Sequence, residues 1–483
     1  MLNDLTTGTL TFWGLSLVIF YCLSKAVYNL TLHPLARFPG PKAAAISHLW
    51  FVTQWRGGRL PFRMQELHRN HGDVVRIGPN DLSFATAGSY RDIYGTNAGG
   101  TRRALVKGTM YEQELKDIGN TREVTSHARL RNILSPGFSA RALTWQEGIV
   151  QKYVDLLIEQ IKAHSREGPV NIVDWFEWMS FDIIGDLTFA ESFDALKHGK
   201  PLYWIKAIPE ATKFMLYKDM GRRLPFLHLF TVFILTRQVM DSLMNHYKLI
   251  AEKTRKRLAL KTDRQDFLTY CINAKELNEQ QLIGNGNALL IAGSETTATS
   301  LGTLTYYLCK NPEKLAKLKE EVRTSFKSND EINGISTAKL PYLVACIKEG
   351  LRIFPPSTYG LPRISHGVVI DGHYVPNGTT VATEPFTVAR DPRYWKDPNS
   401  FLPERWLESD STDNREASQP FSLGPRACMG INLAYLEMRI VLARMIYTFD
   451  WEWVNKDLDW ESESRVYWMW QKPDLMMQYR VVH

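Results

Sequence analysis

The segment at residues 421–430, FSLGPRACMG, constrains the fold of this chain more than any other. It places one cysteine, Cys428, between two glycines and directly before the apolar run INLAYLEMRIVL, which predicts a buried helix. Gly424 and Gly430 allow positive φ and a close approach of the backbone to a flat ligand. Because a sulfur at a helix N-terminus faces unpaired N–H groups and the positive end of the helix dipole, we expect a thiolate at Cys428.

The other cysteines limit what this thiolate can do. The five cysteines of the chain are irregularly spaced and include no C-x-x-C pair, which argues against a disulfide scaffold and a structural zinc site. Three of them are expected to pack as small apolar side chains in helices: Cys271, Cys309 and Cys346. A lone thiolate favours one axial bond to a cofactor metal, and Arg426 is placed to pair with an anionic edge of that cofactor.

An isolated cysteine at a loop–helix junction most often only packs there, but here the whole pattern F-x-x-G-x-R-x-C-x-G is present. Its chance frequency in a chain of this length is about one in ten thousand. The pattern resembles the haem-binding signature of the cytochrome P-450 family, and the resemblance extends over essentially the whole chain. It implies that Cys428 is the axial ligand of haem iron, that Arg426 contacts a haem propionate and that Phe421 shields the sulfur, with Gly424 and Gly430 shaping the loop.

A polar island, Ala-Gly-Ser-Glu-Thr-Thr at residues 292–297, interrupts a predicted helix over residues 279–310. Such an island costs helix propensity, and an interior threonine can bond to the i−4 carbonyl and bend the helix, so a simple bend is one interpretation. The other is a proton relay, which is what the resemblance implies. Thr296 would then guide protons to dioxygen with Glu295 as its acidic neighbour, and Ala292 and Gly293 would flank the oxygen and substrate pocket.

Glu349 and Arg352 have the i,i+3 spacing of an ion pair on one helix face. The same spacing occurs at Glu252/Arg255 and Glu320/Arg323, which we expect to be surface pairs. Phe-Pro-Pro at residues 354–356 and Pro-Glu-Arg-Trp at residues 403–406 follow Glu349 and Arg352 in the order typical of the family. The resemblance therefore implies a structural core network in which Arg405 joins these two residues.

Further cations are candidate propionate partners. Arg363 matches the family arginine that follows the E-x-x-R helix, and the less favoured alternative is a bare surface arginine. The segment His127-Ala-Arg-Leu-Arg131 falls where the family often has W-x-x-x-R. His127 departs from that form, so its role depends on whether an imidazole N–H replaces the indole donor, whereas Arg131 matches directly.

The N-terminus is uncharged from residue 5 to residue 24 and strongly apolar. At about 1.5 Å per residue it is long enough to cross a hydrocarbon core of about 30 Å. Only Asp4 precedes it, whereas Lys25, Arg37 and Lys42 follow, which places the body of the protein in the cytosol. No basic n-region or cleavage site is present, so we predict an uncleaved anchor over residues 1–27.

A proline-rich hinge over residues 28–45 is predicted to connect this anchor to one catalytic domain, residues 46–483. The domain is predicted to be mainly α with small β-sheets, and the resemblance implies the cytochrome P-450 fold, with haem between a long distal helix and the helix after the cysteine loop. Periodicity predicts helices near residues 143–165, 173–190, 233–260, 279–310, 312–327, 339–353 and 431–449. Strands are predicted at residues 73–77, 368–371, 374–375 and 475–481.

The resemblance implies a monooxygenase in the endoplasmic reticulum membrane that binds haem b and takes electrons from NADPH through a separate flavin-containing reductase, with cytochrome b5 as an optional second donor. The absence of a Gly-rich dinucleotide fingerprint agrees with an external donor. The segment YNLTLHPLARFPGPK is similar to fungal members of secondary metabolism, which implies a lipophilic terpenoid, polyketide or alkaloid substrate. The chain has no interleaved basic and aromatic pattern of the kind that indicates nucleic-acid binding.

Two alternatives stay open from the sequence: an isomerase or dehydratase on the same fold that needs no dioxygen, and a non-catalytic haem sensor. The pair Glu295–Thr296 disfavours both, because neither needs a proton relay. The family layout places substrate contacts in four regions: residues 95–120, 292–293, 357–361 and 467–470.

Overall fold

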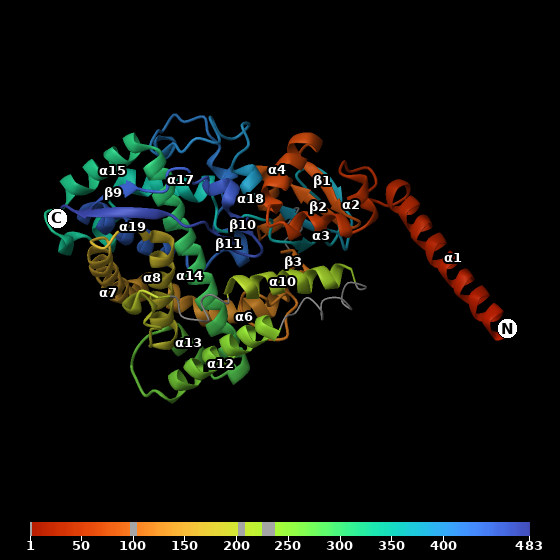
Figure 1. Ribbon diagram of the computed structural model, residues 1–483, viewed down its shortest axis with the longest axis horizontal. Helices are drawn as coiled ribbons and strands as arrows, with labels where there is room; N and C mark the ends of the chain where they lie inside the picture. Colours follow the sequence, from red (N-terminus) through yellow and green to blue (C-terminus); the bar gives the residue numbers. More distant parts are fainter. Residues whose placement is uncertain (1, 97–103, 201–207, 225–236) are drawn as a thin grey trace.

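The computed structural model describes residues 2–96, 104–200, 208–224 and 237–483. The predicted fold class is confirmed, since helices make up most of the body and the sheets are small and peripheral (Figure 1). The helices that periodicity predicts form with closely similar bounds: α7 (Ala140–His164), α8 (Ile172–Phe189), α12 (Arg237–Ala259), α14 (Glu279–Lys310), α15 (Pro312–Ser325), α17 (Pro341–Ile353) and α19 (Ile431–Thr448). The predicted start of the helix near residue 233 lies outside the described residues.

Several helices were not predicted, most of them short. They are α2 (Lys42–Ile46), α3 (Leu49–Arg56), α4 (Leu60–His71), α5 (Ala87–Tyr94), α6 (Val124–Leu134), α9 (Ala195–His198), α10 (Ile208–Arg223), α13 (Phe267–Ala274), α16 (Gly334–Thr337), α18 (Pro385–Val388) and α20 (Trp460–Glu463). A helix of one or two turns gives too few apolar repeats for periodicity to be recognised, so tertiary packing decides its conformation.

The largest sheet has five strands in the order β1-β2-β8-β5-β3, and β2 pairs with β8 in parallel. Its strands are β1 (Val74–Gly78), β2 (Asp81–Phe84), β8 (Thr380–Thr383), β5 (Arg363–Ile364) and β3 (Val106–Lys107). The other sheets are a hairpin of β6 (Val368–Ile370) and β7 (His373–Val375), a three-stranded sheet of β4 (Val170–Asn171), β12 (Met476–Val481) and β9 (Phe449–Trp453), and the pair β10 (Arg465–Val466) and β11 (Trp470–Gln471). Strands distant in sequence meet here, which is why only some of them were predicted.

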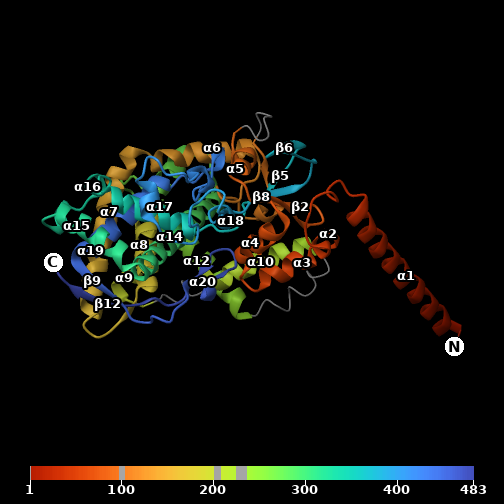
Figure 2. The same cartoon turned by 90° about the horizontal axis from the view of Figure 1, so that it is seen from above.

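Helix α14 runs through the middle of the body and organises the core (Figures 1 and 2). It begins at a capping box, in which the Asn278 side chain accepts from Gln281 N and the Gln281 side chain accepts from Asn278 N. Most of its residues are buried on all sides, and it packs against α8, α17 and α19. Its long apolar sequence therefore forms a central helix rather than a surface helix.

Helix α1 (Leu2–Thr31) projects away from the body (Figure 1). Its residues Gly8–Thr31 are long and apolar enough to cross a membrane, and the apolar 18-residue window within them contains no buried residue. The helix continues past the predicted end of the anchor at residue 27, and Asn29 is held against the body because Arg76 Nη1 donates to its carbonyl at 2.7 Å. The division into anchor, hinge and catalytic domain stays a prediction.

Candidate active site

A cavity of about 380 Å³ lies between α14 and α19 and is closed at its other sides by α6, the cysteine loop and the segment around residue 118. The structure brings nine of the predicted site residues to its wall: His127, Arg131, Ala292, Gly293, Thr296, Phe421, Arg426, Cys428 and Gly430. Three others, Gly424, Glu295 and Arg363, lie close by but are not among the described residues that line it. The remaining three, Glu349, Arg352 and Arg405, form a separate buried network.

The cysteine loop is a tight turn that presents the Cys428 thiol to the cavity. Cys428 N donates to Phe421 O at 2.9 Å, which closes the loop. Gly424 has φ +68°, and a Cβ there would lie 2.3 Å from Tyr94 O, so only glycine fits this position. The positive φ that the sequence suggested for Gly430 is not found, because its φ is −83°. It serves instead as the N-cap of α19, where the nearest side-chain atoms to an added Cβ are 3.7 Å away.

The expected lowering of the Cys428 pKa is also not found in the protein alone. Burial raises the pKa of the thiol, and the Gly430 N–H and Arg131 oppose this only in part. Burial therefore outweighs these two favourable contacts in the protein alone, and a metal cation at the sulfur would favour the thiolate.

Four side chains that can carry positive charge line one end of the cavity: Lys107, His127, Arg131 and Arg426. Among the described lining residues the only carboxylate is Glu437, so the cations have no anionic partner in the wall. Burial lowers the pKa of Arg426 to about 10, and the positive charge of Arg363 contributes to the same shift. Burial lowers the pKa of His127 to about 3, and the positive charges of Arg426 and Lys107 contribute to the same shift.

This end of the cavity fits the haem that the resemblance implies. Uncompensated buried cations destabilise a protein unless a ligand supplies negative charge, and the two carboxylates of haem do so. The two arginines donate to main-chain carbonyls in this structure. Arg426 Nη1 donates to Thr121 O at 2.8 Å, and Arg131 Nη1 donates to Ala427 O at 2.7 Å. A cationic end opposite an apolar wall, with one thiol facing in, matches a flat iron-bearing ring with one acidic edge.

Lys107 belongs to this cluster but was missed from the sequence. It lies on β3, is 6% exposed, and Nζ donates to Gly119 O at 2.5 Å. Burial, then Arg426 and Arg363, lowers its pKa to about 7. No spacing in the sequence marks a lone lysine on a two-residue strand, so only the three-dimensional structure reveals it.

Arg363 does not line the cavity, and its positive charge lowers the pKa values of Arg426 and Lys107. It is buried behind Tyr94, whose ring centroid lies 5.1 Å from the guanidinium carbon, and Nη1 donates to Pro362 O at 3.1 Å. The open interpretation of Arg363 as a surface residue is therefore wrong.

On α14 the polar island forms part of the cavity wall, and its two predicted relay residues point in different directions. Thr296 faces the cavity, and its Oγ1 donates to Ala292 O at 2.7 Å. At Gly293 an added Cβ would lie 2.7 Å from Ile184, so the glycine lets α8 approach the helix closely.

Glu295 instead faces a buried ion cluster behind the helix. Lys472 Nζ lies 3.0 Å from Glu295 Oε2 and 2.7 Å from Glu177 Oε1. Burial would lower the pKa of Lys472, but Glu177 and Glu295 together raise it above its ordinary value. Burial raises the pKa of Glu177 to about 7 despite Lys472. The cluster was missed because its members are far apart in the sequence.

Glu437, on α19, is a second residue that sequence reasoning missed. It is 3% exposed and contacts Thr297 across the cavity edge, and burial raises its pKa to about 8. At neutral pH this carboxyl is largely protonated, which explains how an acid tolerates the apolar wall.

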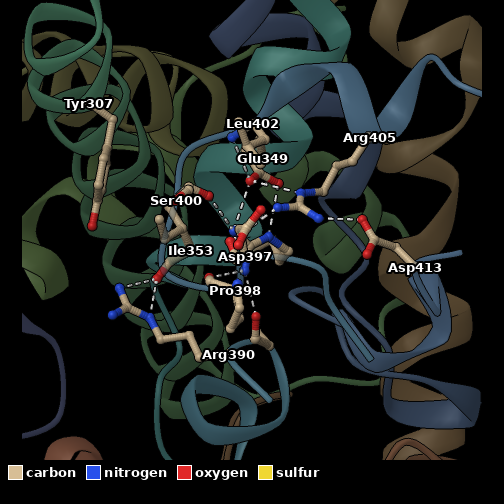
Figure 3. Close-up of polar contacts among 12 residues, drawn as sticks. Tyr307, Glu349, Ile353, Arg390, Asp397, Pro398, Ser400, Leu402, Arg405 and Asp413 are labelled. Atoms are coloured by element: carbon tan, nitrogen blue, oxygen red, sulfur yellow. Dashed lines mark hydrogen bonds and ion pairs between the residues drawn. The ribbon is translucent and has the colours of Figure 1, made fainter. Parts of the chain in front are cut away.

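The predicted Glu349 network is present (Figure 3). Glu349 and Arg352 are fully buried, and both carboxylate oxygens accept from the Arg352 guanidinium at 2.8 Å. Arg405 Nε donates to Glu349 Oε1 at 3.1 Å and Arg405 continues to Asp413. Trp406 Nε1 donates to Glu349 Oε2 at 2.9 Å. Trp406 and Asp413 are two members of the network that the sequence did not indicate.

The comparison pairs behave differently from Glu349 and Arg352. Glu252 pairs with Lys256 and Arg255 with Glu279, all on the surface, while Arg323 pairs with Asp450. The i,i+3 spacing alone therefore does not identify a core pair.

The expected substrate regions are partly found in the cavity wall. Ile118, Gly119, Ser357 and Leu361 line it together with Ala288 and Leu289 of α14. Residues 467–470 are not among its described lining residues; Trp470 is buried against Phe354, with 4.2 Å between ring centroids. Residues 97–103 of the first region lie outside the described residues.

Comparison with known proteins agrees with this site. The family model described as cytochrome P-450 matches residues 39–478. Cytochrome P-450 monooxygenase BOA3 of Botryotinia fuckeliana is 38% identical over 504 residues, covering 100% of this chain and 99% of that protein. Cytochrome P-450 monooxygenase poxC of Penicillium oxalicum is 39% identical over 494 residues, covering 98% and 96%. Cytochrome P-450 monooxygenase atr2 of Stereocaulon alpinum is 37% identical, covering 96% and 94%.

Proposed function

Since the chain belongs to the cytochrome P-450 family and is a monooxygenase, we propose that it oxidises a lipophilic small molecule of fungal secondary metabolism with electrons from a separate NADPH-dependent reductase. The observation that carries this proposal is the cavity itself, where a single thiol and a cluster of basic side chains, buried at Lys107 and His127 and half-buried at Arg131 and Arg426, meet at one largely apolar space. The dioxygen-independent isomerase and the haem sensor have no support from the relatives, which are named monooxygenases.

Haem b is the cofactor of the family, and when bound it activates dioxygen and supplies the oxidising power for attack on a C–H bond. Cys428 would supply the sulfur ligand to its iron, and Phe421, also in the cavity wall, packs against Tyr435 at 5.4 Å between ring centroids. Arg426, Arg131, His127 and Lys107 would hold its carboxylate edge. Arg363 adds positive potential from the layer behind.

The remaining residues of the wall bind substrate and handle protons. Apolar side chains make up most of the cavity wall, and α14 adds the hydroxyls of Thr296, Thr297 and Ser300, which suits a neutral, lipophilic substrate of the terpenoid, polyketide or alkaloid classes. The Thr296 hydroxyl donates its proton to Ala292 O, and rotation about χ1 can direct this hydroxyl toward the cavity. Glu295 would act from behind the helix through its ion cluster, because it does not line the cavity.

Thr296→Ala provides the test of this function. In vesicles with an NADPH-dependent reductase, we expect product per NADPH to fall about tenfold and hydrogen peroxide per NADPH to rise, because the hydroxyl that handles protons is lost. The substrate is the compound with the largest spin-state shift in a panel of terpenoids, polyketides and alkaloids. Thr305→Ala is the matched control, since Thr305 makes the same bond to an i−4 carbonyl, Leu301 O at 2.9 Å, away from the cavity. Unchanged coupling in Thr296→Ala would remove Thr296 from the reaction.

Helix α1 is proposed to anchor the protein in the endoplasmic reticulum membrane, with the catalytic domain and its reductase on the cytosolic side. Deletion of residues 5–24 is expected to move the protein into the soluble fraction while the carbon monoxide spectrum of the haem persists. The deleted residues are exposed or outside the described side chains, and Asn29 with its contact to Arg76 is retained. Sedimentation of the deleted protein with membranes would contradict α1 as the sole anchor.

A further inference from the structure

The turn at residues 115–121 forms the part of the cavity wall that faces α14. Ile118 and Gly119 line the cavity together with Ala288 and Leu289 of the helix. The turn is internally bonded: Asn120 N donates to Asp117 Oδ1 at 2.8 Å, and Asn120 Nδ2 donates to Leu115 O at 2.6 Å. Because these bonds tie the turn together, a contact at the Ile118 amide also positions the neighbouring residues that line the cavity.

Asn285, on α14, makes that contact. Its side chain is fully buried, and Oδ1 accepts from Ile118 N at 3.0 Å. Nδ2 donates to Gln281 O at 2.7 Å, one turn earlier in the helix. The two bonds need opposite ends of the amide, so its orientation is fixed and Asn285 satisfies a buried backbone N–H that would otherwise be unpaired.

Gly284 brings the turn directly onto the helix at the same place. A Cβ at Gly284 would lie 2.9 Å from Lys116 O and 3.1 Å from Leu115 Cγ, which is closer than normal contact. On its other side the turn is held by the cation cluster, since Lys107 Nζ donates to Gly119 O and Arg426 Nη1 to Thr121 O. The turn is therefore fixed between α14 and the residues proposed to hold the cofactor.

We propose that Asn285 is a positioning residue for substrate selectivity, which fixes Ile118 and Gly119 in the cavity wall through the Ile118 amide. This inference rests on the proposed function for the meaning of the cavity, but not for the contact itself. An apolar residue would pack equally well at a buried helix position, whereas asparagine has poor helix propensity and needs both of its bonds satisfied. Its place is explained by the turn that it holds.

The test uses Asn285→Leu in the full-length holoprotein and two probes that coordinate haem iron. Imidazole is the smaller probe, whereas 4-phenylimidazole carries an additional phenyl ring that the cavity must accommodate. We expect the ratio of the two dissociation constants to change about fivefold, while the carbon monoxide spectrum is unchanged. Hydrogen exchange of the Ile118 amide is expected to become about tenfold faster. Asn287→Leu is the matched control, because Asn287 is on the same helix and instead bonds His246 at 2.7 Å.

A second variant keeps the inference testable if Asn285→Leu fails to fold. Gly284→Ala leaves Asn285 in place and favours the helix, but its Cβ displaces Lys116 and Leu115. We expect it to change the ratio of the dissociation constants as well. Unchanged Ile118 exchange in Asn285→Leu, or equal shifts for imidazole and 4-phenylimidazole in both variants, would overturn the proposal. If the wild type showed no thiolate spectrum, the proposed function would fail, yet the exchange measurement would still decide whether Asn285 holds the turn.

Discussion

Cys428→Ser is expected to abolish the red-shifted Soret band of the reduced, carbon monoxide-bound protein and to reduce monooxygenase activity to the level of a control without enzyme. Serine has nearly the same shape as cysteine, so the loop closed by Cys428 N and Phe421 O can still form. A hydroxyl is a much weaker acid than a thiol and does not supply the soft anionic ligand that pushes electron density toward the iron. The loss is therefore expected to be chemical rather than structural.

The matched control is Cys22→Ser, because Cys22 is exposed on α1 and remote from the cavity. Haem content is measured with the spectrum, since the cation cluster remains in Cys428→Ser and can still bind the carboxylate edge of haem. A variant that retains haem but loses the thiolate band would support both assignments together. Retention of the band in Cys428→Ser would show that another residue is the axial ligand.

The parts of this site that the sequence predicted are those encoded by local spacing. The cysteine loop, the i,i+3 pair of Glu349 and Arg352, and the small residues of α14 each lie within a few positions of one another, so one element presents them together. The motif order along the chain then placed Arg405 with Glu349, as found. Most of the long helices were predicted for the same reason, since their apolar repeats are numerous, but α10, with 16 residues, was not.

Glu295 illustrates a prediction that helix geometry could have refined. Adjacent residues on an α-helix point about 100° apart, so Glu295 and Thr296 do not share a face. Thr296 lines the cavity, and Glu295 pairs with Lys472 on another side. The sequence could not identify the partner of Glu295, because Lys472 lies 177 residues later in the chain, near the C-terminal strands.

Cys428 and Lys107 show why electrostatics could not be inferred from the sequence. At Cys428 the helix N-terminus favours the thiolate and burial favours the thiol, and burial has the larger effect on the pKa. Lys107 is near cations from two distant segments, Arg363 and Arg426, and its pKa is lowered chiefly by a burial that no local pattern reveals. The balance depends on depth in the structure, which is a tertiary property.

Glu349→Gln is expected to destabilise the protein by about 3–5 kcal/mol, the cost of removing one partner from a buried ion pair. The carboxylate accepts five hydrogen bonds: two from the Arg352 guanidinium and one each from Arg405 Nε, Trp406 Nε1 and the Leu402 N–H. Its loss leaves one uncompensated guanidinium charge where solvent cannot reach it. Domain stabilities are about 5–15 kcal/mol, so we expect little folded, haem-loaded protein, measured as haem per polypeptide and by thermal unfolding in detergent.

Glu252→Gln is the control for the chemical change, because Glu252 is 62% exposed in its side chain and pairs with Lys256 on the surface. Exposed pairs contribute about 0–1 kcal/mol, so this variant should match the wild type. Equal behaviour of Glu349→Gln and Glu252→Gln would contradict the role of the buried network.

The double variant Glu349→Leu/Arg352→Leu separates charge balance from packing. The network holds two cations, Arg352 and Arg405, and two anions, Glu349 and Asp413, so its net charge is zero. Either single leucine variant leaves one unpaired charge in the core, whereas the double variant leaves Arg405 with Asp413 and restores neutrality. The double variant should therefore lose less stability than the sum of the two single variants, by about 1–3 kcal/mol. Strict additivity would mean that the carbonyls bound by Arg352, those of Ala389, Pro398 and Ser400, matter more than its charge.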